Sequence, residues 1–193
     1  MNKVILGLVL GLATLSVHAQ TASISLSENS AQLKYALLVG AQSFGRNELG
    51  GGFLFNSEDD YVAEASLNVI GEAGASVPGL MLGVGAKLIG ANIPDPANSA
   101  SSYNLMGLAL GGQLKYAMPF EARVAVAFEG YYSPAIVSWF DSERMSEWAL
   151  QLGYEILPQA AIYTEYRGFG ADTANAKDLS FGSGFRFGVR MNF

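Results

Sequence analysis

Hydrophobic and polar side chains alternate at every second position along most of the chain after residue 20. From Met106 to Tyr116, for example, one face is apolar except for Gly112 and has three leucines, while the other consists of glycine, alanine, Gln113 and Lys115. Successive side chains of a β-strand point to opposite faces, so a period of two predicts strands with one apolar face and one polar or small face. The pattern therefore predicts an all-β fold.

Turn residues separate these segments and define about ten strands. The predicted strands span residues 22–28, 31–40, 49–57, 61–71, 79–89, 102–117, 121–133, 144–157, 159–169 and 181–193. If the first two are not separate strands, the count is eight. Longer polar loops are predicted at 90–101, 134–143 and 170–180, and they alternate with short turns. Single-chain bacterial barrels have even strand counts, short periplasmic turns and longer outer loops. The spacing thus predicts an up-and-down antiparallel β-barrel with both termini on the periplasmic side.

The N-terminus has the order of a secretory signal peptide. Lys3 is followed by an apolar run from Val4 to Val17, and small residues precede a cleavage site between Ala19 and Gln20. The apolar run is shorter than the ~20 residues that span a bilayer as a helix. We therefore predict a signal peptide at 1–19 and one barrel domain at 20–193.

Alternation fits two kinds of barrel. A soluble periplasmic barrel that binds an apolar ligand would turn its apolar face inward, whereas an outer-membrane barrel turns that face to lipid. Hydrophobic residues make up 50% of the chain, yet they are spread evenly and mixed with 23 glycines. Aromatic residues gather near both strand ends, with Tyr131, Tyr132 and Trp139 at one end, as expected for interfacial girdles. These features favour the membrane barrel, with lipid as its partner.

The polar face contains charges of both signs, which would converge on the axis of a narrow barrel. A buried charge without a partner is costly, so these residues must pair inside the lumen. Glu129 and Glu165 are interpreted as partners of Arg123 and Arg167. The predicted lumen residues are Lys34, Glu64, Lys87, Lys115, Arg123, Glu129, Glu147, Glu155, Glu165, Arg167, Arg186 and Arg190.

The last strand ends in alternating aromatic and polar residues. Arg186, Gly188, Met191 and Phe193 resemble the closing-strand signature of outer-membrane barrels. That resemblance implies recognition by the barrel-assembly machinery during biogenesis.

Candidate chemistry is sparse. The only histidine, His18, lies in the predicted signal peptide, and the chain has no cysteine, so a nucleophilic serine would lack its usual base. Glu58-Asp59-Asp60 fits a solvated turn better than a calcium site. A net charge of −6 argues against nucleic acid as a partner. We predict no catalytic site, cofactor or metal, although a lipid-modifying enzyme is a less favoured alternative.

Three stretches of the sequence are distinctive: Glu129-Gly130-Tyr131-Tyr132-Ser133-Pro134, then Asp141-Ser142-Glu143, and the pair Tyr166-Arg167. They resemble the YfaZ family of small Gram-negative outer-membrane proteins. The resemblance implies an outer-membrane location and supplies no catalytic residues. The expected function is a structural or surface-interaction protein, or a narrow channel with a charge-filled lumen. The sequence does not indicate an oligomeric state.

Overall fold

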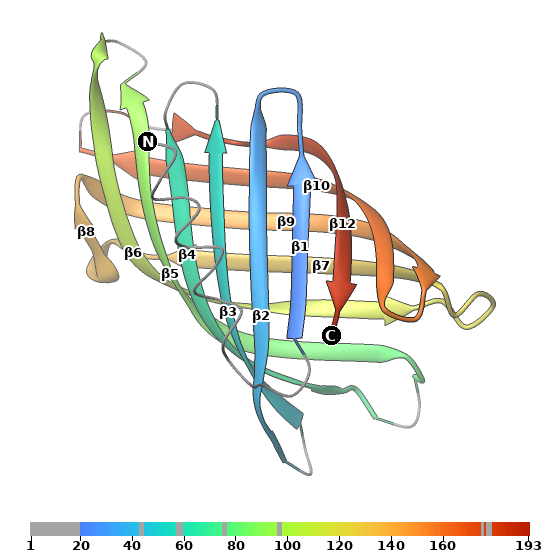
Figure 1. Ribbon diagram of the computed structural model, residues 1–193. Helices are drawn as coiled ribbons and strands as arrows, with labels where there is room; N and C mark the ends of the chain where they lie inside the picture. The colour runs from blue at the N-terminus through green and yellow to red at the C-terminus, as the bar shows by residue number, and fades with distance from the viewer. Residues whose placement is uncertain are drawn as a thin grey trace.

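Ten long β-strands form one antiparallel sheet that closes on itself (Figure 1). The computed structural model describes residues 20–42, 45–56, 60–74, 77–95, 98–174, 176 and 179–193. The long strands are β1 (Gln20–Leu26), β2 (Ser30–Gln42), β3 (Gly45–Asn56), β4 (Tyr61–Glu72), β5 (Leu80–Asp95), β6 (Asn98–Ala117), β7 (Val124–Ser133), β9 (Ser142–Leu157), β10 (Ala160–Thr173) and β12 (Gly184–Asn192). No helix within these ranges is long and apolar enough to cross a bilayer.

The first and last strands close the barrel. In the antiparallel pairing of β1 with β12, Thr21 lies opposite Asn192 and Leu26 lies opposite Phe187. The circular order is β1, β2, β3, β4, β5, β6, β7, β9, β10, β12 and back to β1. The prediction of ten strands is confirmed, and the eight-strand alternative is wrong. Closure leaves no long unpaired strand edge, which would otherwise be a site of aggregation.

We call the rim where β1 begins and β12 ends the terminal end, and the opposite rim the loop end. At the loop end, the predicted loops 90–101 and 170–180 are largely strand. β5 and β6 run on to Asp95 and Asn98, and β10 continues to Thr173 before the short β11 (Leu179–Ser180). Loop 134–143 contains a 3-10 helix, η2 (Ala135–Val137), and the short β8 (Ser138–Phe140), which pairs with β6.

Side-chain hydrogen bonds support the longer β5–β6 hairpin. Asn92 Nδ2 donates to Ser102 Oγ and to Asn104 Oδ1, both at 3.0 Å. These polar side chains suggested a loop in the sequence, but here they bridge two strands across the hairpin.

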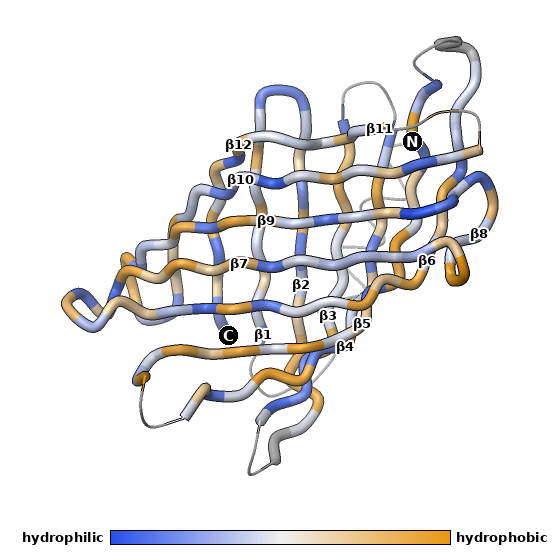
Figure 2. Tube along the Cα trace, turned by 180° about the vertical axis from the view of Figure 1, so that it is seen from behind, coloured by the Kyte–Doolittle hydropathy of each residue, from blue (hydrophilic) through white to orange (hydrophobic). Residues whose placement is uncertain are grey.

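Apolar side chains cover the outside of the barrel. Trp148, Leu150, Leu152, Tyr154 and Ile156 alternate along β9 and are each 42 to 52% exposed. Figure 2 shows this alternation of hydrophobic and hydrophilic residues along the strands. The soluble barrel with an inward apolar face is therefore wrong.

The interior changes character along the barrel. Charged side chains occupy its middle, and a buried apolar cluster fills it towards the loop end. We call this cluster the apolar plug. Its residues are Leu54, Val62, Ile89, Ala91, Ile93, Leu105, Ala109, Tyr131, Met145, Phe169, Ala171, Leu179 and Phe181.

Candidate functional site

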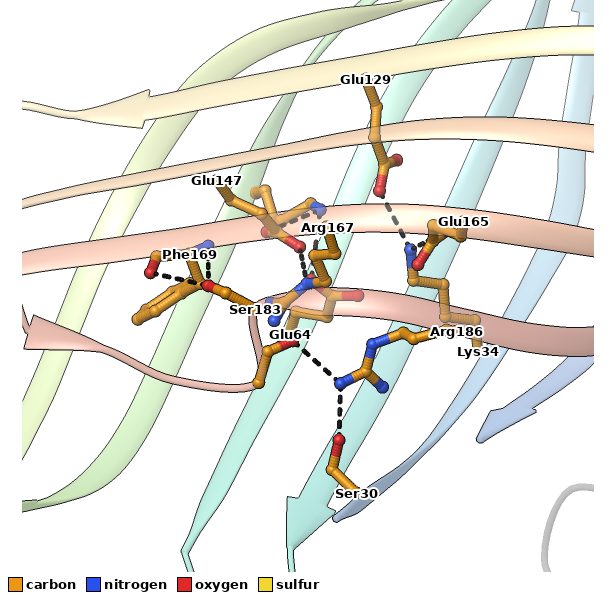
Figure 3. A network of polar contacts seen from close by, with 12 residues as sticks. Ser30, Lys34, Glu64, Glu129, Glu147, Glu165, Arg167, Phe169, Ser183 and Arg186 are labelled. Atoms are coloured by element: carbon orange, nitrogen blue, oxygen red, sulfur yellow. Dashed lines mark hydrogen bonds and ion pairs between the residues drawn. The ribbon is translucent and has the colours of Figure 1, made fainter. Parts of the chain in front are cut away.

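Glu147 on β9 binds two cations inside the lumen. Its Oε2 lies 3.0 Å from Lys87 Nζ on β5, and its Oε1 lies 3.0 Å from Arg167 Nε on β10. All three side chains are at most 4% exposed. Lys87 also pairs with Glu64 Oε2 on β4 at 3.1 Å. We call these four residues the central network; Figure 3 labels Glu64, Glu147 and Arg167 among them.

Aromatic rings complete the surroundings of the central network. Lys87 Nζ lies 4.4 Å from the centroid of the Tyr131 ring, and the Arg167 guanidinium lies 5.4 Å from that of Phe169. Such contacts stabilise a cation through the negative face of the ring. The Tyr131 hydroxyl donates to Asn68 Oδ1 at 2.7 Å. Tyr131 therefore lies in the lumen, and its prediction as an interfacial girdle residue is wrong.

A second network lies beside the first and is less buried. Lys34 Nζ on β2 is 3.0 Å from Glu129 Oε1 on β7 and 3.9 Å from Glu165 Oε2 on β10. Gln151 Nε2 donates to Glu165 Oε2 at 3.3 Å. In the circular strand order β2 and β7 are five steps apart, so the Lys34–Glu129 pair crosses the lumen. Together the two networks fill the middle of the barrel.

Arg186 ties the connection after β11 to the barrel wall. Its fully buried guanidinium donates from Nη2 to Ser30 Oγ at 2.6 Å and to the Gly182 carbonyl at 2.9 Å. Ser183 Oγ accepts from the Phe169 amide at 3.0 Å. These bonds hold Leu179 and Phe181 in the apolar plug, where they are 3% and 7% exposed.

The structure brings most predicted lumen residues together, but with other partners than expected. Glu129 pairs with Lys34, and Arg167 pairs with Glu147, so the predicted Glu129–Arg123 and Glu165–Arg167 pairs are wrong. The reason is that several of these side chains reach across the lumen to distant strands. Lys115, Glu155 and Arg190 line the lumen nearer the terminal end.

Arg123 is not in the lumen. It is exposed and belongs to the turn between β6 and β7. Hydrogen bonds from the Glu121 amide to the Met118 carbonyl and from the Val124 amide to the Glu121 carbonyl, of 3.2 and 2.9 Å, form this turn. β7 consequently begins only at Val124, and the prediction that Arg123 is a lumen charge is wrong.

The closing strand has the two faces that its pattern predicts. Met191 and Phe193 are 47% and 67% exposed, whereas Arg186 is buried. A Cβ on Gly188 would overlap the Tyr163 ring, so close packing also explains this glycine. The assembly signal formed by Arg186, Gly188, Met191 and Phe193 stays a prediction. Gln20 pairs with Phe193, and Ala19 lies outside the described residues, as does the rest of the predicted signal peptide.

A cavity of about 500 Å³ extends from the terminal end to the two networks. Its wall includes Lys34, Glu64, Lys87, Glu129 and Glu165 at the bottom. Nearer the termini it includes Arg46, Glu48, Gln113, Lys115, Gln151, Glu155, Tyr163 and Arg190. The cavity has charges of both signs, and its deeper wall also includes the buried Tyr131 and Ala149.

A family model described as YfaZ precursor matches residues 1–193. The chain belongs to the YfaZ family. Among solved structures, the NanC porin is similar to this YfaZ chain with 15% identity and a TM-score of 0.50, over 92% of this chain and 95% of that one. The outer-membrane channel DcaP of Acinetobacter baumannii is 12% identical with a TM-score of 0.44, over 89% and 53%. No curated protein matches the sequence.

The family and the barrel fold establish this YfaZ chain as an outer-membrane β-barrel. Sequence reasoning missed two of its cavity residues, Arg46 and Glu48, because the predicted third strand began at residue 49. The sequence did contain a sign of this, because Arg46 and Glu48 continue the every-second-residue pattern of Gly50 and Gly52 on the inward face. In the Glu58-Asp59-Asp60 stretch, which the sequence favours as a solvated turn over a calcium site, Glu58 and Asp59 lie outside the described residues. Asp60 is described, and it accepts a hydrogen bond from Asn56 Nδ2 at 3.0 Å.

Proposed function

We propose that the protein is an outer-membrane barrel without enzymatic activity whose lumen is a blind polar vestibule. The vestibule is the 500 Å³ cavity, which is entered from the terminal end. The observation that carries the proposal is the position of two successive barriers beyond it. The central network comes first, and the apolar plug lies behind it towards the loop end.

The two barriers oppose ion passage in different ways. At the central network an ion would have to separate pairs that are 3.0 Å apart and almost completely buried. At the plug it would have to shed its water among apolar side chains, which is how hydrophobic constrictions close channels. A barrel of about eight strands is already just wide enough to be filled by side chains. Ten strands with this filling suit a closed lumen.

The absence of enzymatic activity is proposed from the way the polar groups are used. Glu147 and Glu129, which could serve as acids or bases, are each engaged by a lysine or arginine at 3.0 Å. No histidine follows residue 18 in the sequence. The YfaZ membership supplies no catalytic residues.

A second candidate is a narrow channel that opens when the plug moves. The likeness to the NanC porin favours it at the level of the fold. Because hydrogen bonds of Arg186 and Ser183 hold the plug segment, breaking them would release it.

Conductance in a planar bilayer tests the closed lumen. We expect the wild-type protein to give no steady openings. The variant Leu179→Ala/Phe181→Ala removes large side chains from the apolar plug. The variant Glu147→Ala/Arg167→Ala removes both members of one buried ion pair, and Lys87 still pairs with Glu64. Since either barrier blocks ions, only the variant that combines all four changes should conduct. Heat-dependent mobility in electrophoresis serves as the control for folding.

Steady openings of the wild-type protein would contradict the blind vestibule and support the open channel. Openings after thinning the plug alone would show that the central network is no barrier. In that case the gated channel would replace the closed barrel.

A further inference from the structure

Three basic side chains line the vestibule near the terminal end. They are Arg46 on β3, Lys115 on β6 and Arg190 on β12. None of the ion pairs formed between described residues includes them, whereas Lys34, Lys87 and Arg167 deeper in the lumen each pair with a glutamate. We call these three residues the cation tripod.

The tripod surrounds the barrel axis nearly evenly. In the circular strand order β3 and β6 are three steps apart, β6 and β12 are four, and β12 and β3 are three. Lys115 shares this part of the cavity wall with the basic Arg46 and Arg190 and with the acidic Glu48 and Glu155. Three cations held around one axis leave a position between them that favours an anion.

The charge balance locates the excess positive charge at this level. The two networks and Arg186 contain four basic and four acidic residues, so the deeper lumen is balanced. The level of the tripod contains three basic side chains and two acidic ones, Glu48 and Glu155. An added anion therefore meets a side-chain excess of one positive charge at the mouth and no such excess at the bottom.

Neutral groups beside the tripod are suited to hydrogen bonding with a small solute. Arg190 packs over the Tyr163 ring, with its guanidinium carbon 5.3 Å from the ring centroid, and contacts Gln151 Oε1. Gln113 also lines this part of the cavity. Ligand sites commonly have volumes of ~300–1,000 Å³, and the vestibule of about 500 Å³ falls within that range.

We propose that the cation tripod of Arg46, Lys115 and Arg190 binds a small anionic solute, a carboxylate or a phosphate, that enters the vestibule from the terminal end. The inference rests on the vestibule of the proposed function and adds the chemical class of its ligand. Arginine holds planar carboxylate and phosphate groups through paired donors, while lysine contributes a point charge.

Isothermal titration calorimetry on the folded protein in non-ionic detergent at low salt tests the proposal. The probes are inorganic phosphate, succinate and succinamide, the last of which matches succinate in shape but has no charge. Phosphate and succinate should bind, and succinamide should not. Added sodium chloride should weaken binding because the tripod is partly exposed to water.

The variants separate the tripod from the overall charge of the protein. Lys115→Gln and Arg190→Gln should each weaken binding of succinate roughly tenfold, which corresponds to about 1.4 kcal/mol. Lys115→Arg should retain binding. The matched control is Arg123→Gln, which removes the same charge at the same end but outside the lumen, and it should leave the affinity unchanged. Heat-dependent mobility confirms that each variant is folded.

Three results would overturn the inference: no binding of phosphate or succinate by the wild type, equal binding of succinamide, or equal weakening by Arg123→Gln. The conductance experiment distinguishes this failure from failure of the proposed function. A barrel that is electrically silent but binds no anion leaves the closed lumen intact. A barrel that conducts and binds succinate through the tripod keeps the inference and removes the blind vestibule.

Discussion

Replacing Glu147 by glutamine removes the one negative charge that holds two buried cations. The substituted side chain would keep its size and could still accept a hydrogen bond, so the change is mainly electrostatic. Lys87 would retain Glu64 at 3.1 Å, but Arg167 would lose its ion-pair partner and keep the ring of Phe169 at 5.4 Å. Most of the cost should therefore arise at Arg167.

The magnitude follows from the two 3.0 Å contacts. At an effective dielectric constant of about 20, each contact contributes about 5.5 kcal/mol of Coulomb attraction. Neutralising Glu147 also removes the cost of burying its own charge, which amounts to several kcal/mol. The balance is a loss of about 3–5 kcal/mol in the free energy of unfolding, as is usual when one partner of a buried pair is removed.

Glu129→Gln is the matched control. Glu129 also pairs at 3.0 Å, but it and Lys34 are about a quarter exposed to the vestibule, at 25% and 26%. Water screens this pair, so its loss should cost only about 1 kcal/mol. Urea unfolding in phospholipid vesicles, followed by emission from the two tryptophans, measures both variants. The dependence of the unfolding free energy on urea concentration should be the same for all variants, because it reports the surface exposed on unfolding.

Equal losses for Glu147→Gln and Glu129→Gln would refute this reasoning, because burial would then make no difference. A second variant tests the cause. In Glu147→Gln/Arg167→Met the uncompensated cation is absent, so stability should recover most of the loss. If the double variant is as unstable as Glu147→Gln alone, the cost comes from packing and not from the unpaired guanidinium.

Two further predictions concern the outer wall and the close packing of strands. Leu150→Arg places a charge on the lipid face near the middle of β9 and should cost about 2–4 kcal/mol of unfolding free energy in vesicles. Phe120→Arg lies in the β6–β7 turn and should cost only about 0–1 kcal/mol. Similar losses for the two variants would contradict the inferred membrane boundary. Gly111→Ala presses its Cβ into the Gly130 carbonyl oxygen and should cost about 1–3 kcal/mol, whereas Gly153→Ala meets nothing nearer than 3.8 Å and should change stability little. Urea titration measures both glycine variants, and a stable Gly111→Ala protein would show that the wall yields easily.

The strand count could be predicted from the sequence because the bilayer requires an apolar outer face on each strand. Every lipid-facing position must be apolar, so the side chains of β9 from Trp148 to Ile156 leave a regular signal. The strand ends could not be predicted in this way. Beyond the membrane, a hairpin such as β5–β6 is held by backbone and Asn92 side-chain hydrogen bonds, and polar residues there look the same in a strand as in a loop.

The identity of most lumen charges could also be predicted, but not their partners. Parity alone places Lys34 and Glu129 inside. Their contact depends on β2 and β7 lying on opposite walls of the barrel. The alternation along a single strand does not determine which side chains meet across the lumen. The prediction for Arg123 was wrong for a local reason, because the β6–β7 turn extends further along the chain than the alternation indicated.

Along single strands, the inward-facing side chains change from charged to apolar halfway towards the loop end. On β5 Lys87 is followed on the same face by Ile89, Ala91 and Ile93, and on β10 Arg167 is followed by Phe169 and Ala171. An apolar inward face has no lipid to meet, so it can be stable only if it packs against itself and excludes water. In the proposed blind vestibule, water therefore reaches the lumen from the terminal end. A solute that reaches the cation tripod must leave by the way it entered unless Leu179 and Phe181 move, which favours a binding vestibule over a conduit.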